Sequence, residues 1–127
     1  MAMKVKEIRI VVRPFEEDFD EVVDTFNKIE RGEDVKDEKI VVESLDVLRK
    51  ALTPERLKII HVTKTKKPES IYELSKILGR DRASVTRDIE YLKLLGLIEF
   101  EDVKDVRDKK KPVVTYDEIV ISIPVVV

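Results

Sequence analysis

The sequence predicts an α+β fold in two parts. Residues 1–52 have the pattern of a strand, a helix, a strand and a helix, and residues 53–127 that of three helices followed by a β-hairpin. Apolar residues recur at three- and four-residue steps in the helical segments. Helix-capping residues stand before those segments, and β-branched residues fill the segments between them. A hydrophobic share of 43% over 127 residues is enough to form a core.

The first part begins with EIRIVV, an alternating β-branched run that Pro14 ends. The apolar residues that follow at helical spacing are Phe15, Phe19, Val22, Val23, Phe26 and Ile29. Gly32 ends this predicted helix. A second strand, KIVVES, precedes a helix, SLDVLRKAL, that Ser44 caps. Because two strands do not form a stable sheet alone, we expect them to pair with the C-terminal strand, with a second subunit, or with both.

Each of the three helices in the second part has a start signal. Thr53 with Pro54 begins the first helix, Ser70 with Glu73 forms a capping box for the second, and Asp81 caps the third. The residues expected to face inward are Leu57, Ile60 and His61 in the first helix, Ile71, Leu74, Ile77 and Leu78 in the second, and Val85, Ile89, Leu92 and Leu95 in the third.

The connection between the second and third helices is short. Gly79 ends the second helix, and the third begins about three residues later. A connection of this length makes the two helices cross steeply, as in a helix–turn–helix, so the third helix projects and can lie in a major groove. Gly96 ends the third helix, and LIEFEDV and PVVTYDEIVISI then predict a hairpin around a lysine-rich turn.

The outward face of the third helix, over residues 82–95, is rich in cationic and hydroxyl side chains. Together with the link that precedes the helix, this face presents Arg80, Arg82, Ser84, Thr86, Arg87 and Tyr91. Arginine pairs with guanine or phosphate, and hydroxyl groups reach phosphates or base edges. The alternative is an ordinary solvated helix whose arginines pair with Asp81, Asp88 or Glu90.

The predicted hairpin tip, residues 104–111, supplies a second basic cluster. Its cations are Lys104, Arg107, Lys109, Lys110 and Lys111. Such a tip beside a recognition helix can reach the minor groove or its phosphates. The alternative is a lysine-rich turn that keeps a strand edge soluble.

Composition argues against an enzyme, a metal site or a cofactor site. The chain has no cysteine and a single histidine, His61, which we expect to be a partly buried structural residue. The three glycines form no nucleotide-binding fingerprint. The N-terminus lacks the pattern of a signal peptide, and no apolar run is long enough for a membrane span, so we expect a cytoplasmic protein without a membrane partner.

Net charge is −2 for the whole chain, but it is unevenly distributed. Residues 1–53 carry 10 Lys and Arg against 14 Asp and Glu, which gives −4, and the remaining residues therefore sum to +2. An acidic first part suits a protein partner, and the clustered cations of the second part suit nucleic acid.

The segment SIYELSKILGRDRASVTRDIEYLKLLGLIEFE resembles the winged helix–turn–helix of prokaryotic transcriptional regulators, including the multiple-antibiotic-resistance-regulator type. It is most similar to small, mostly archaeal predicted DNA-binding regulators. That group places SLxxLRKxLTPxRLxII before the winged helix and ends in YDEIxIxIP. Here these motifs are SLDVLRKALTPERLKII and YDEIVISIP, so the resemblance covers residues 44–124.

The resemblance implies sequence-specific binding of double-stranded DNA, with residues 53–127 as a winged-helix DNA-binding domain. It implies that Arg82, Ser84, Thr86 and Arg87 read bases or phosphates and that the tip around Lys109 to Lys111 is the wing. We expect a transcriptional repressor that forms a homodimer through residues 1–52 or the apolar tail EIVISIPVVV. The alternatives are a winged helix that binds only protein and an antitoxin-type autoregulator whose acidic front holds a partner protein.

Overall fold

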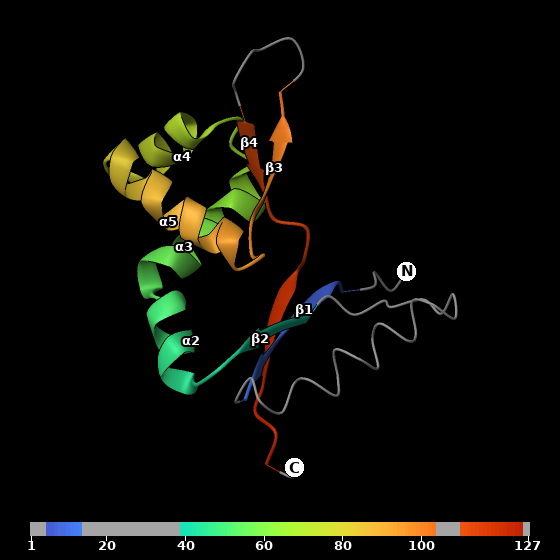
Figure 1. Ribbon diagram of the computed structural model, residues 1–127. Coiled ribbons are helices and arrows are strands. Elements are labelled where there is room, and N and C mark those ends of the chain that lie inside the picture. Colours follow the sequence, from blue (N-terminus) through green and yellow to red (C-terminus); the bar gives the residue numbers. More distant parts are fainter. Residues whose placement is uncertain (1–4, 14–38, 104–109, 126–127) are drawn as a thin grey trace. The chain divides into compact units, whose positions relative to one another are not determined.

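A computed structural model describes residues 5–13, 39–103 and 110–125 (Figure 1). Within these ranges it contains four helices and five strands, which confirms the predicted α+β class. The chain divides into two compact units. The first comprises residues 1–49 with 116–127, and the second comprises residues 50–115. The helix predicted after Pro14 lies outside the described residues.

The first unit contains a three-stranded parallel sheet in the order β2–β1–β5. Its strands are β1 (Glu7–Val12), β2 (Lys39–Val42) and β5 (Glu118–Ser122). In the central strand Ile10 is in register with Ile40 on one side and Ile121 on the other. Pairing with the C-terminal strand was one of the expected arrangements, and it is confirmed.

The C-terminal segment differs from the expected single long strand. It forms β4 (Lys110–Val113) and β5, with residues 114–117 between them. β4 pairs with β3 (Glu99–Asp102), whereas β5 pairs with β1. Because the β1–β5 ladder belongs to the first unit, residues 116–127 fall there, whereas the sequence-based division placed them with residues 53–115.

The helices begin where the capping residues predicted. In α2 (Leu45–Ala51), the Val47 N–H donates to Ser44 Oγ at 3.2 Å. At α3 (Pro54–Lys66), Thr53 Oγ1 accepts from the Arg56 N–H, also at 3.2 Å. At α4 (Ile71–Leu78), Ser70 Oγ accepts from the Glu73 N–H at 3.1 Å.

Only half of the predicted capping box at α4 is formed. The Glu73 side chain reaches back to the Glu69 N–H at 3.2 Å rather than to the N–H of Ser70. One residue earlier in the chain than the capping box requires, the same carboxylate still satisfies a backbone donor before the helix.

The second unit is built around α5 (Arg82–Leu94), whose inner residues Val85, Ile89 and Leu92 are fully buried, as predicted. It packs with α3 and α4, and the antiparallel β3–β4 pair completes the unit (Figure 1). The link from α4 to α5 has the predicted length. Gly79 takes a left-handed conformation with φ of 65° and ends α4, and Asp81 Oδ2 accepts from the Ser84 N–H to cap α5.

The inner face of α3 agrees with the prediction only in part. Ile60 is buried, as predicted, but Leu57 and His61 are exposed, and the other buried positions are Ile59, Val62 and Thr63. α3 contacts α4, α5 and β4, and a helix enclosed by several neighbours buries a wider face than one stripe. In α4, Leu74 is fully buried, but Ile77 is 44% exposed, because Ser75 occupies the second inner position.

Candidate nucleic-acid interface

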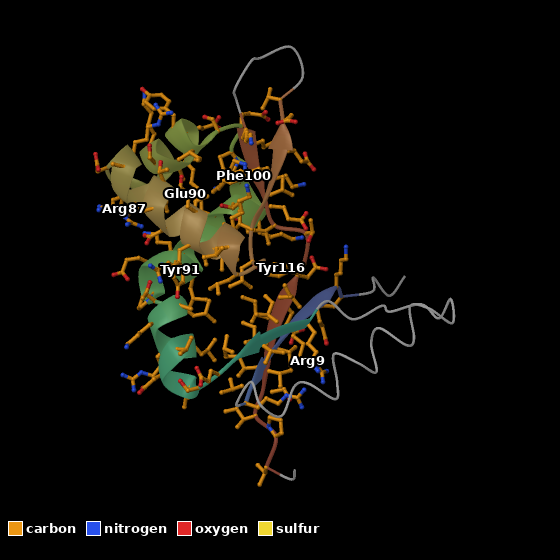
Figure 2. The ribbon with its side chains drawn as sticks, in the orientation of Figure 1. Arg9, Arg87, Glu90, Tyr91, Phe100 and Tyr116 are labelled. Atoms are coloured by element: carbon orange, nitrogen blue, oxygen red, sulfur yellow. The ribbon has the colours of Figure 1, made fainter. Side chains whose placement is uncertain are left out.

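The outward face of α5 carries exposed cations close to the start of the helix. Arg82, Ala83 and Arg87 are exposed, and Ser84 and Thr86 are half-buried. Figure 2 labels Arg87 on this helix. Among the residues that the structure describes, Arg87 makes no ion pair and no side-chain hydrogen bond. Its guanidinium is therefore available to an external partner.

Arg80 has an internal role, in contrast to Arg87. Its Nη2 donates to Asp88 Oδ2 at 2.8 Å and to Ser84 Oγ at 2.9 Å. The Arg80 side chain is 27% exposed and that of Asp88 is 17% exposed, so the pair is partly shielded from water. The alternative interpretation, in which an arginine pairs with Asp88, therefore describes Arg80, and Ser84 belongs to the same network.

Arg56 completes this network from α3, and sequence reasoning missed it. Its Nε donates to Asp88 Oδ1 at 3.1 Å, and its Nη1 donates to the carbonyl oxygen of Lys50 at 2.7 Å. The guanidinium also stacks 4.1 Å from the centre of the Tyr91 ring. Tyr91 is therefore partly covered by Arg56. A carboxylate beside the apolar stripe of α5 is the one sequence signal that indicated such a partner.

The basic hairpin is described only in part. Lys104, Arg107 and Lys109 lie outside the described residues. Lys110 and Lys111 both belong to β4, and Lys111 Nζ lies 3.8 Å from Glu69 Oε1. Lys110 has no ion pair within the described ranges, so it is the available cation of this strand.

A groove of about 600 Å³ lies within the second unit. It is lined by residues from the start of α4, from α5, and from β3 and β4. They include Tyr72, Arg82, Glu90, Lys93, Phe100 and Lys110. Figure 2 labels Glu90 on α5 and Phe100 on β3. Of these six residues, the sequence singled out Arg82 and Lys110 as binding residues. The others come together from separate elements, so no local motif indicated them.

The two rings of the groove each have a cation beside them. Arg82 Cζ lies 6.0 Å from the centre of the Tyr72 ring, and Lys93 Nζ lies 5.1 Å from the centre of the Phe100 ring. A second cation, Lys76 on α4, has its Nζ 4.7 Å from the centre of the Tyr72 ring. The pKa of Lys76 is raised, because the Tyr72 side chain accepts a hydrogen bond from the ammonium group and interacts with its charge.

The described residues contain neither a cluster of metal-ligating side chains nor a helix that could span a membrane. They contain no cluster of three His, Cys, Asp or Glu side chains that could hold a metal. None of the helices in the described ranges combines the length and the apolar content that a bilayer crossing requires.

Comparison with known proteins places the chain in a family. No curated protein matches the sequence. A model of the HVO_A0114 family matches residues 51–121, which is more than half of the chain and includes all of α3, α4 and α5. The family's description states no fold or activity, so the resemblance to winged helix–turn–helix regulators stays a prediction. On the extent of this match, the chain belongs to the HVO_A0114 family.

Proposed function

We propose that the protein binds double-stranded DNA through α5 and represses transcription, without catalytic activity of its own. The observation that carries the proposal is the exposed face of α5, where Arg82 and Arg87 flank small and hydroxylated residues close to the helix start. Side chains near the start of a projecting helix are those that contact base edges in a major groove.

The order of elements in the second unit supports this proposal. Three helices, with a three-residue link between the second and third, precede an antiparallel strand pair. This order is compatible with a winged helix in which α5 is the recognition helix and the β3–β4 hairpin is the wing. Lys110, which is in register with Asp102, then stands at the loop end of the strand pair, where a cation contacts phosphates without reading sequence.

The direct test is selection of duplexes from a random pool with the full chain, followed by titration of the recovered site. We expect a recovered consensus and an affinity that falls steeply with salt concentration, since phosphate contacts release counterions. Arg87→Ala is compared with Arg49→Ala, which removes an exposed arginine from α2. Recovery of no consensus would contradict the proposal, and so would equal loss of binding to a recovered site in both variants.

We also propose that the protein acts as a homodimer, with the acidic first part available to a protein partner. Two copies related by a twofold axis present two α5 helices to half-sites about one helical turn apart. Light scattering at micromolar concentration should give twice the chain mass of 14.8 kDa. A monomer mass, with or without the selected duplex, would remove this part of the proposal.

A second candidate function is protein recognition through the same helix. Leu94, at the end of α5, is 83% exposed, and an apolar side chain of this exposure suits a protein interface better than a phosphate backbone. The two functions differ in their response to Leu94→Ser. This substitution should leave duplex binding unchanged if α5 reads DNA, and it should abolish capture of a partner if α5 reads protein.

A further inference from the structure

The groove beside α5 has the dimensions of a small-ligand site. Its volume of about 600 Å³ lies within the range of pockets that bind small molecules. All of its lining residues come from the second unit, so it is formed by one compact body. Tyr72 from α4 and Phe100 from β3 supply rings, and α5 supplies charged side chains.

Within the part of the chain that the structure describes, the charged side chains of the groove are not ion-paired with one another or with other residues. Arg82, Lys93 and Lys110 are cationic, and within the described residues none of them has a carboxylate partner. Glu90 is the one acidic residue of the lining, and it makes no ion pair or hydrogen bond within the same ranges. Three cations facing one carboxylate favour a ligand with a multiply charged anionic group, such as a phosphate monoester.

The rings add a preference for a flat ligand. Tyr72 is 51% exposed and Phe100 is half-buried, so part of each ring is open to a ligand. Exposed aromatic side chains bind nucleobases by stacking, and an adjacent cation strengthens that contact. Both rings here have such a cation, Arg82 for Tyr72 and Lys93 for Phe100.

Glu90 requires a donor on the ligand. A carboxylate opposes a plain anion, but it accepts hydrogen bonds from the exocyclic amino group of adenine, cytosine or guanine. A nucleotide with an amino-bearing base is the ligand that provides a phosphate, a flat ring and an exocyclic amino donor together. From this combination we infer that the groove binds one unpaired nucleotide of this kind.

The unpaired nucleotide has two sources, a free mononucleotide and the end of a single strand. Bases inside a duplex are paired and stacked, so they do not offer a free face to Tyr72 or Phe100. Arg82 and Lys110 also belong to the DNA surface of the proposed function. This part of the inference rests on the proposed function: a nucleotide bound in the groove should compete with duplex DNA for the same residues.

The test is a calorimetric titration of the full chain with adenosine 5′-monophosphate. Three related probes each lack one feature: ribose 5-phosphate lacks the base, adenosine lacks the phosphate, and uridine 5′-monophosphate lacks the exocyclic amino group. We expect each to bind at least about tenfold more weakly than adenosine 5′-monophosphate. A short 5′-phosphorylated oligoadenylate distinguishes the sources, because tighter binding than the mononucleotide identifies a strand end and weaker binding a free nucleotide.

Two variants place the binding in the groove. Phe100→Leu removes a ring and should weaken adenosine 5′-monophosphate about tenfold, and Glu90→Ala should abolish the preference for it over uridine 5′-monophosphate. The control for the second variant is Glu55→Ala, an exposed glutamate on α3 that does not line the groove. Unfolding curves of all variants establish that they are folded.

Three results would overturn the inference: no measurable binding of adenosine 5′-monophosphate, binding of ribose 5-phosphate as tight as that of adenosine 5′-monophosphate, or binding like the wild type by both groove variants. Duplex binding measured on the same samples without nucleotide tests the proposed function separately. Failure of nucleotide binding therefore leaves the proposed DNA binding standing, and failure of duplex binding leaves the nucleotide site standing.

Discussion

Asp88 accepts a hydrogen bond from Arg80 Nη2 at 2.8 Å, which ties the residue just before the cap of α5 to the middle of the helix. The other carboxylate oxygen accepts from Arg56 on α3. One carboxylate thus joins the α4–α5 link, α5 and α3. Because this network fixes α5 from its inner flank, the outward face of the helix stays open, with Arg87 available.

Replacement of Asp88 by alanine should destabilise the protein. It leaves two guanidinium groups partly shielded from water without their carboxylate, and Arg80 Nη1 already has no hydrogen-bond partner among the residues that the structure describes. Because these side chains keep some exposure to water, the expected loss in the free energy of unfolding is moderate, roughly 2 kcal/mol. Urea unfolding measures it. Asp46→Ala is the control, because its pair with Arg49 is about four-fifths exposed and should contribute little.

Arg87 and Arg80 should separate binding from stability. Under the proposed function, Arg87→Ala should weaken binding to the selected duplex by roughly 1–3 kcal/mol without changing the unfolding curve. Arg80→Ala should instead lower the unfolding free energy by about 1 kcal/mol, since it removes hydrogen bonds to Asp88 and Ser84. Equal effects of the two variants on duplex binding would show that this division of roles is wrong.

The sequence predicts features that depend on neighbouring residues better than features that depend on residues far apart in the chain. The helix starts at Thr53, Ser70 and Asp81 follow from residues within three positions, so they are predictable. The buried face of α3 depends on which elements surround it, and Ile59 replaces Leu57 for that reason.

The same distinction holds for the candidate site. The exposure of Arg87 follows from helical periodicity within α5. The engagement of Arg80 does not, because its partner Asp88 lies eight residues further on and the third member, Arg56, is 32 residues from Asp88. The groove is harder still to predict, since α4, α5, β3 and β4 each supply part of it.

Tyr116 should make stability sensitive to alkaline pH. It is 4% exposed, and burial raises the pKa of its phenol well above the usual value. The folded state therefore favours the protonated phenol, and this contribution is complete below the unfolded pKa of about 10 and is lost as pH rises above it.

The measurement for Tyr116 is the unfolding free energy of the wild type and of Tyr116→Phe at pH 9 and pH 11. Above about pH 10, the wild type should lose up to about 1.4 kcal/mol per pH unit relative to the variant. The difference between the two proteins isolates Tyr116 from the lysines that titrate in the same range. A constant difference across this range would mean that the phenol ionises equally in both states.

Gly79 should tolerate asparagine better than alanine. Its φ of 65° lies in the left-handed region, and a Cβ added there meets no atom within 4 Å, so any cost comes from the backbone and not from a clash. Alanine in this conformation should lower the free energy of unfolding by about 1 kcal/mol, whereas asparagine adopts the conformation more readily. Unfolding free energies of Gly79→Ala and Gly79→Asn measure the difference. Because the link from α4 to α5 begins at this residue, Gly79→Asn should also keep duplex affinity closer to the wild type than Gly79→Pro, whose ring fixes a negative φ.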